Sequence, residues 1–207
     1  MADDDSVLDL GCGTGLGFEL LDRKGPKLFG MDISTEMLAI CRQKHPDAIL
    51  VEGDFEDSRL MPDGHFGLVS MYFAVGSYAR DLSAVIRSSR ERTRPGGYLY
   101  VSVLNRWSLR RIVRLRFRAT EHYKTRKDGT AIAVPVATTY SRSTLHRILA
   151  RAGYVLVWSG SGSVFAGVIE KPRFWGLAER LSLMFPLGAH TFEIIARLPD
   201  VPVTTPS

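Results

Sequence analysis

The sequence predicts an α/β fold with a doubly wound, mainly parallel sheet and helices on both faces. Three observations support this prediction. Strand-like and helix-like segments alternate over the first 104 residues, a glycine-rich loop follows the first strand, and the content of 45% hydrophobic and 24% charged residues is typical of globular domains. A chain of 207 residues can bury a substantial core, so we expect a single domain over residues 1–207.

Strands and helices alternate regularly in the first half of the chain. Helices are expected to begin at Phe18 and to cover 35–44 and 82–93. Ser34 is a good N-cap for the second helix, and Pro95-Gly96-Gly97 is expected to end the third. Apolar runs predict five strands, at Val7–Leu10, Lys27–Ile33, Ile49–Phe55, Phe66–Phe73 and Tyr98–Leu104. On the second helix, the helical spacing places four residues on one inward face, namely Met37, Leu38, Ile40 and Cys41.

The regular alternation of strands and helices ends after Asn105. Residues 106–118 contain six arginines among apolar residues, and Asp128-Gly129 is a sequence typical of a hairpin turn. We therefore expect a basic lid or hairpin inserted at about 106–140. Regular structure is predicted to return with a helix over 141–152, which Gly153 closes, and with strands over 154–158 and 191–198.

Charge is distributed unevenly. Residues 1–100 hold 11 Lys/Arg and 16 Asp/Glu, whereas residues 101–207 hold 16 and 6, so their formal net charges are −5 and +10. The acidic part can bind a ligand that carries a cation. The basic part favours an anionic substrate, a membrane surface or nucleic acid, or it is simply a solvated basic surface, and these alternatives stay open.

Several classes of protein are disfavoured. No apolar stretch is long enough for a membrane-spanning helix, and the acidic start of the chain lacks the features of a signal peptide. Cys12 and Cys41 show no metal-ligand spacing. We therefore expect a cytoplasmic protein with two free thiols and no bound metal.

The richest motif is the loop Asp9-Leu10-Gly11-Cys12-Gly13-Thr14-Gly15-Leu16-Gly17. It follows a strand and precedes a helix, which is the context of a nucleotide-binding turn. The dinucleotide pattern G-x-G-x-x-G does not fit, because Leu16 or Phe18 occupies the position of its third glycine. A pyrophosphate site is therefore disfavoured.

The loop instead resembles the D-x-G-x-G-x-G motif of class I S-adenosylmethionine (SAM) dependent methyltransferases. Further pieces of the family pattern follow in order, at Asp32, Gly53-Asp54-Phe55, Phe66–Ser70 and Arg94–Gly97. The resemblance covers residues 7 to about 104 closely and 140–154 loosely. It implies a seven-stranded type of sheet with an antiparallel last strand, and SAM as the cofactor of a methyltransferase.

The resemblance also implies roles for single residues. Asp9 would hold the ammonium group of SAM directly or through water. The N–H groups of the loop would bind its carboxylate, and Asp32 would bind its ribose hydroxyls. For Asp32, a helix cap is the alternative. The cofactor-binding residues implied in this way are Asp9, Gly11, Cys12, Gly13, Thr14, Gly15, Asp32, Ile33, Gly53, Asp54, Phe55 and Met71.

The sequence departs from the family in two places. Gly67 stands where the family usually has an acid. Family members also usually carry one or two helices before the first strand, whereas here this strand is predicted to begin at about residue 7. The site is then unusually open, or another chain or the insertion covers it, or the chain is shortened.

The acceptor is the least determined part of the prediction. The Asn/Asp-Pro-Pro-Tyr/Phe motif of many nucleobase and protein amide methyltransferases is absent, because Tyr72-Phe73-Ala74-Val75 stands in its place. The remaining prediction is methyl transfer to O, N or C of a small-molecule or lipid-like acceptor, with anionic or membrane-surface contacts through 106–118. The alternatives are a non-catalytic SAM-fold binding module or truncated methyltransferase and, less favoured, an RNA methyltransferase.

A general base is needed only for a weakly nucleophilic acceptor such as a hydroxyl. His122 is the candidate, because it begins the expected hairpin, and an exposed histidine without function is the alternative. His65 is expected to be structural and His146 to lie at the surface. The apolar stretch 174–185 could line an acceptor pocket, although packing in the core is the favoured explanation.

Overall fold

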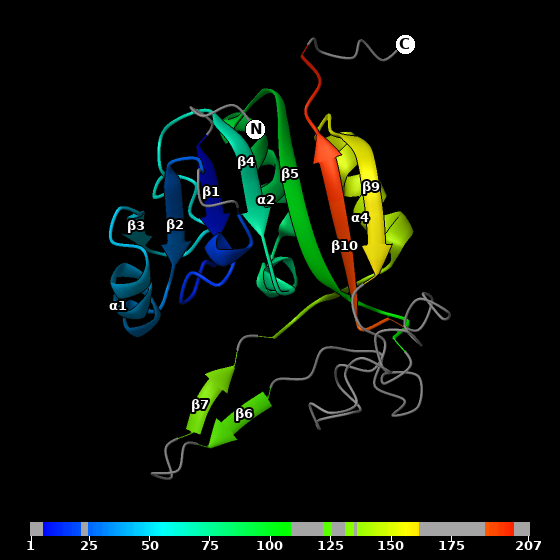
Figure 1. Cartoon of the computed structure of the whole chain (residues 1–207). Helices are drawn as coiled ribbons and strands as arrows, with labels where there is room; N and C mark the ends of the chain where they lie inside the picture. The colour runs from blue at the N-terminus through cyan, green and yellow to red at the C-terminus, as the bar shows by residue number, and fades with distance from the viewer. Residues whose placement is uncertain are drawn as a thin grey trace, which may run out of the picture.

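The computed structural model describes residues 6–21, 25–108, 122–125, 131–134, 136–161 and 189–200, and for 122–125 and 131–134 it describes the backbone alone. The described part is built around one twisted sheet (Figure 1). Its strands are β1 (Val7–Leu10), β2 (Leu28–Asp32), β3 (Ile49–Glu52), β4 (Phe66–Met71), β5 (Thr93–Asn105), β8 (Thr139–Tyr140), β9 (Val155–Ser161) and β10 (Thr191–Arg197).

The sheet has the order β3-β2-β1-β4-β5-β10-β9, with β8 paired to β5. The pairs among β1 to β5 are parallel. Strand β10 runs antiparallel to both of its neighbours, β5 and β9. The predicted doubly wound, mainly parallel sheet with an antiparallel last strand is therefore confirmed.

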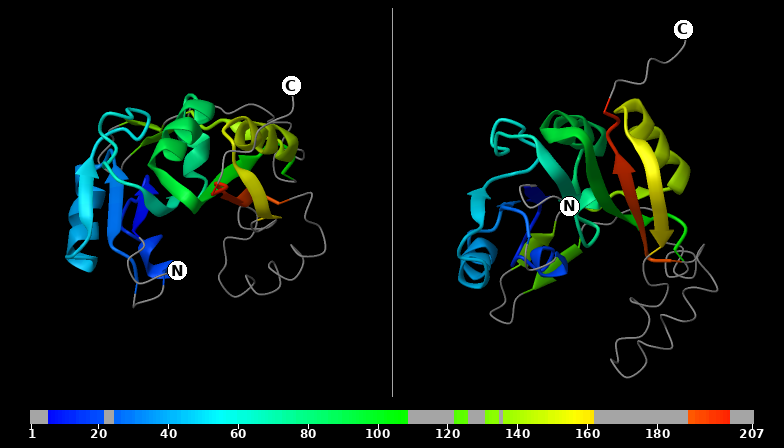
Figure 2. Two further views of the ribbon diagram at one scale, coloured as in Figure 1. Left: turned by 90° about the horizontal axis from the view of Figure 1, so that it is seen from above. Right: turned by 45° about the horizontal axis from the view of Figure 1, so that its top comes forward.

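Helices cover opposite faces of this sheet (Figure 2). Helices α2 (Leu82–Arg92) and α4 (Arg142–Arg151) lie on one face, whereas the 3-10 helix η1 (Phe18–Leu20) and α1 (Thr35–Lys44) lie on the other. A side-chain oxygen caps each α-helix by accepting a backbone N–H of its first turn. These caps are Ser34, Asp81 and Ser141.

Two hydrophobic clusters match the two faces. The larger one joins the strands to α2 and α4, with side chains such as Leu8, Leu99 and Leu145 fully buried. The smaller one packs Cys12 of the loop and Phe18 of η1 against α1. Both cysteines are buried and free.

Three predicted elements differ from those in the structure. The helix predicted at Phe18 is a short 3-10 turn in the described residues, because Leu21 is already extended. The third strand ends at Glu52, before a turn in which the Asp54 carboxylate accepts the Glu56 N–H. On α1, Leu38 and Cys41 are buried, but Met37 and Ile40 are exposed, because only a narrow stripe of this helix meets the sheet.

The third predicted helix also ends differently. Helix α2 stops at Arg92, and β5 begins at once with Thr93, so that Pro95-Gly96-Gly97 lies inside the strand. At this junction the buried Thr93 hydroxyl donates to the Ser89 carbonyl and shares a hydrogen bond with the Tyr154 hydroxyl. Pro95, Gly96 and Gly97 instead lie where the register between β4 and β5 shifts.

The predicted hairpin is present. Strands β6 (His122–Thr125) and β7 (Ala131–Val134) pair antiparallel and lie apart from the main sheet, below the carboxyl ends of its parallel strands (Figure 1). Its Asp128-Gly129 turn, most of 106–118 and the whole of 174–185 are outside the described residues. Within the described part, none of the helices is long and apolar enough to span a membrane.

Candidate functional site

The candidate site begins at the loop between β1 and η1. Gly11 and Gly15 have positive φ angles of 71° and 80°, which side chains with a Cβ rarely adopt. A Cβ at Gly11 would lie 2.6 Å from the Val75 side chain, and one at Gly15 would lie 2.8 Å from the Cys41 sulfur. The loop therefore needs glycine for its conformation and also for its close approach to its neighbours.

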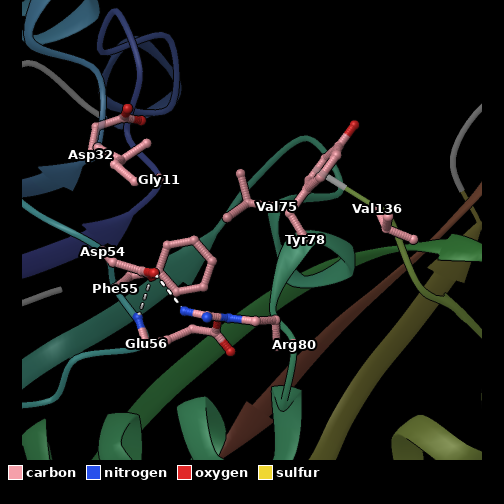
Figure 3. A pocket seen from close by; sticks show the side chains of 10 residues that line it. Gly11, Asp32, Asp54, Phe55, Glu56, Val75, Tyr78, Arg80 and Val136 are labelled. Carbon is pink, nitrogen blue, oxygen red and sulfur yellow. Dashed lines mark hydrogen bonds and ion pairs between the residues drawn. The ribbon is translucent and has the colours of Figure 1, made fainter. Parts of the chain in front are cut away.

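Beside this loop lies a cavity of about 570 Å³, which is within the range of small-molecule sites (Figure 3). Five residues of its wall were predicted from the sequence, namely Gly11, Asp32, Ile33, Asp54 and Phe55. Five were not, namely Glu56, Val75, Tyr78, Arg80 and Val136. Glu56 follows the predicted Asp54-Phe55 pair directly, whereas the others come from later segments without a motif of their own.

Asp32 holds the loop in place at the end of β2. Its carboxylate accepts the Gly13 N–H at 2.8 Å and the Ser34 N–H at 2.9 Å. The cap of α1 is the Ser34 hydroxyl, which accepts the Met37 N–H, so Asp32 itself is not the N-cap. Because Asp32 lines the cavity and each of its carboxylate oxygens has a further lone pair, it can also accept hydroxyl groups there.

A second acidic group lies across the cavity, where Arg80 bridges Asp54 and Glu56 (Figure 3). The Arg80 guanidinium lies 3.0 Å from the Asp54 carboxylate and 2.7 Å from that of Glu56. Burial alone would raise the pKa of Glu56, but hydrogen bonds from the Arg80 side chain and the Asp81 N–H lower it below its usual value. The Phe55 ring beside these charges gives the cavity an acid next to an aromatic surface, which suits a flat heterocycle with an exocyclic amine.

Asp9 lies at the centre of the site but not on its wall. It is 1% exposed, and the Ser70 hydroxyl donates to it at 2.9 Å. Burial, and secondarily the charge of Asp32, raises the pKa of Asp9 to about 7, although the Ser70 hydrogen bond opposes this shift. Burial therefore favours the protonated form of Asp9, which lies directly beneath the loop.

Comparison with known proteins agrees with this geometry. The sequence profile of a methyltransferase domain matches residues 2–158, which is most of the chain. The chain belongs to this methyltransferase family. The resemblance to class I SAM-dependent methyltransferases is thereby confirmed.

Curated relatives match the methyltransferase over part of their length. It is 36% identical over 98 residues to dTDP-3-amino-3,4,6-trideoxy-alpha-D-glucopyranose N,N-dimethyltransferase of Streptomyces venezuelae, covering 46% of this chain and 41% of the relative. It is 32% identical over 132 residues to the ubiquinone biosynthesis O-methyltransferase of Xanthomonas oryzae pv. oryzae, covering 57% and 54%. The chain thus spans about half the length of the curated relatives it matches.

Solved structures support the fold of the methyltransferase. Two solved structures are similar to this chain, namely a SAM-dependent methyltransferase from Mesorhizobium loti and a putative one from Listeria monocytogenes. Their TM-scores are 0.66 and 0.70, and each is 17% identical in sequence to this chain. The matches cover 95% and 96% of this chain, and 93% and 92% of the solved chains.

The other predicted cofactor residues do not line the cavity. Cys12 is buried against Gly30, and burial raises the pKa of its thiol far above the usual range. The Met71 side chain is fully buried in the larger core cluster. A ligand contact from either residue would therefore come from its backbone. Asp9, Gly13, Thr14, Gly15 and Gly53 are likewise not among the residues that line the cavity.

The predicted base of the methyltransferase stays untested. The backbone of His122 begins β6, but its side chain is outside the described part of the chain. His65 is exposed, whereas His146, expected at the surface, has a buried Nε2, and burial lowers its pKa. Among the described residues, no group of three or more His, Cys, Asp or Glu could hold a metal ion.

Proposed function

We propose that this chain binds SAM in the cavity beside the Gly11–Gly17 loop and transfers its methyl group to O, N or C of a small-molecule or lipid-like acceptor. The observation that carries the proposal is one cavity wall with two separated acidic groups, Asp32 near the loop and Asp54 beside the Phe55 ring (Figure 3).

The chemistry of these residues fits SAM. Asp32 can accept the two ribose hydroxyls while it keeps its hydrogen bonds from the N–H groups of Gly13 and Ser34. Asp54 can accept the exocyclic amine of adenine, and Phe55 offers a surface for the ring. Asp9, beneath the loop, can hold an ammonium group at the methionine end in its ionised form, directly or through water.

SAM supplies a methyl group that its sulfonium has already activated. The protein therefore needs chiefly to position the acceptor in line and to exclude water. A base such as His122 is required only where the acceptor atom is a weak nucleophile such as a hydroxyl.

The named relatives support a small-molecule acceptor. The Streptomyces relative is an N,N-dimethyltransferase of an amino sugar nucleotide, and relatives in Xanthomonas and Chlorobaculum act in ubiquinone biosynthesis and on demethylmenaquinone. We retain the expectations of a cytoplasmic protein and of anionic or membrane-surface contacts through 106–118.

Titration calorimetry with SAM and S-adenosylhomocysteine tests the cofactor. If neither SAM nor S-adenosylhomocysteine binds and NADH does, the proposal is overturned in favour of an oxidoreductase. Methyl-labelled SAM, incubated separately with pools of metabolites, lipids, RNA and protein, then tests the acceptor. Label in the metabolite or lipid pool is expected, whereas SAM binding without label in any pool would favour a non-catalytic binding module.

A further inference from the structure

The end of helix α1 contacts the cofactor loop through His45. This residue directly follows α1, and its backbone N–H donates to the Cys41 carbonyl at 2.8 Å. Its half-buried ring reaches the loop, where Nε2 lies 3.2 Å from the Gly15 carbonyl oxygen. Because a carbonyl oxygen can only accept, Nε2 carries a proton and donates a hydrogen bond to Gly15.

The His45 ring is closely packed on both sides of this hydrogen bond. The Phe18 ring meets it edge to face, with the centroids 5.3 Å apart and the planes at 89°. A Cβ at Gly15 would lie 2.6 Å from Cδ2 and 2.9 Å from Nε2 of His45. The ring therefore fills the space that a side chain at position 15 would need.

The Gly15 carbonyl accepts a second hydrogen bond, from the Phe18 N–H at 3.1 Å. Two donors on one carbonyl oxygen use both of its lone pairs and fix the orientation of the Gly15–Leu16 peptide. A trans peptide carries its carbonyl and its N–H on opposite sides. The Leu16 N–H therefore points away from His45.

This Leu16 N–H is available to a ligand. Among the described residues it has no hydrogen-bond partner, and Leu16 is exposed. The Gly13 and Gly15 N–H groups of the same loop are instead bound, to the Asp32 carboxylate and the Cys12 carbonyl. An oriented backbone N–H attracts an anion, and the anion of the proposed cofactor is the carboxylate of its methionine part.

The segment after the loop gives it little support. The 3-10 helix η1 has three residues, and Leu21 is already extended. Contacts from the end of α1 include the His45 hydrogen bond and an exposed ion pair between Lys44 and Glu19, at 2.8 Å. Of these two contacts, only the hydrogen bond of His45 reaches the loop itself.

We propose that His45 is a positioning residue for the cofactor, because its hydrogen bond to Gly15 orients the Leu16 N–H toward the carboxylate of SAM. This inference rests on the proposed methyltransferase function. It adds to the site a residue from another element, outside the glycine-rich motif, and assigns it to the methionine part of the cofactor.

Two probes that differ only in a carboxylate test this role. They are S-adenosylhomocysteine and its decarboxylated analogue, which keeps the thioether and the amine. Titration calorimetry on the full chain gives both affinities, and their ratio is the readout. We expect the wild type to prefer S-adenosylhomocysteine, and loss of the His45 donor to reduce this preference by about tenfold, as for one hydrogen bond to a charged group.

Two variants separate the hydrogen bond from the packing of the ring. His45→Phe keeps an aromatic ring against Phe18 but removes the donor, so it should lose the preference and keep most of the thermal stability. His45→Gln keeps an N–H donor near the place of Nε2 but removes the ring, so it should lower the melting temperature and retain the preference.

Lys44→Gln is the matched control, because it breaks the neighbouring ion pair with Glu19 and leaves the loop contact intact. It should keep the preference of the wild type. A general loosening of α1 from η1 would instead lower the preference in this variant as well.

Binding of S-adenosylhomocysteine to the wild type is measured first, and its absence would contradict the proposed function itself. If it binds, equal affinities of the wild type for the two probes would overturn the role of His45 alone. The same holds for an unchanged preference in His45→Phe, for an equal loss in His45→Gln, and for an equal loss in Lys44→Gln.

Discussion

Asp9 is a carboxylic acid that the fold has removed from water. Its pKa is raised to about 7 in the native protein, chiefly by burial, from about 4 in an unfolded chain. The folded state therefore binds the proton more tightly than the unfolded state. The stabilisation from this proton is fully present below about pH 4 and is lost as the pH rises through about 7.

We therefore expect the ligand-free protein to lose stability between pH 4 and pH 7 relative to Asp9→Asn, which cannot ionise. With about 1.4 kcal/mol for each pKa unit, the loss is on the order of 4 kcal/mol. Denaturant unfolding of both proteins across this range measures it. If the free energies of unfolding of the two proteins change equally between pH 4 and pH 7, Asp9 does not titrate in this pH range.

Asp32 combines a structural and a proposed binding role. Replacing it by Ala removes the acceptor of the Gly13 N–H in the loop, of the Ser34 N–H before α1 and of the proposed ribose hydroxyls. Since hydrogen bonds to a charged group contribute about 1.5–3 kcal/mol, SAM affinity should fall by at least about tenfold. Titration calorimetry measures this change.

Ser34→Ala is the matched control for Asp32, because it removes only the cap of α1. It should lower stability by about 1 kcal/mol and leave SAM affinity unchanged. An Asp32→Ala protein with lower stability but wild-type affinity would show that Asp32 is purely structural.

At the scale of elements, Arg80 ties the turn after β3 to the start of α2. It contacts Asp54 and Glu56, while Glu56 also accepts the Asp81 N–H. The turn and the helix are thus fixed together on one wall of the cavity (Figure 3). Arg80 is a positioning residue, since it holds the Asp54 carboxylate toward the place proposed for adenine.

Arg80→Ala should therefore reduce discrimination between S-adenosylhomocysteine and its 6-oxo analogue, whose oxygen meets the Asp54 carboxylate unfavourably. The Arg80 side chain is 81% exposed, so screening by solvent keeps the expected change in the affinity ratio small. Arg59→Ala, which breaks an exposed pair with Asp57 outside the cavity, is the control. An unchanged affinity ratio in Arg80→Ala would contradict the positioning role.

The sequence predicts elements well where local signals suffice. Helix α1 has the predicted bounds, because Ser34 caps it and its neighbours favour a helix. The start of β5 was mispredicted, and the contacts at this junction include a hydrogen bond between Thr93 and Tyr154, 61 residues away, which no local signal reveals. Likewise, half of the cavity wall was predicted from the loop and the strand ends, but Tyr78, Arg80 and Val136 reach it through the fold alone.

The whole molecule separates its acidic and basic parts. Every acidic residue of the cavity wall lies in the first 100 residues, whose formal net charge is −5. The six arginines of 106–118 belong to the remaining part, with a formal net charge of +10. The proposed cofactor site and the basic segment are therefore chemically distinct, and salt can separate their contributions.

If the acceptor is a small molecule, methyl transfer in the metabolite or lipid pool should change little between about 50 and 200 mM salt. Binding to RNA through several arginines would instead fall steeply, with a log–log slope of about −0.9 per phosphate contacted in a duplex and about −0.7 in a single strand. The matched variant replaces Arg110, Arg111 and Arg114 by Gln, which removes three charges from the basic segment. We expect it to retain SAM affinity and methyl transfer to the small-molecule or lipid pool. Label in RNA, together with a steep salt slope and the loss of both in the triple variant, would identify the basic segment as a nucleic-acid contact and overturn the small-molecule acceptor.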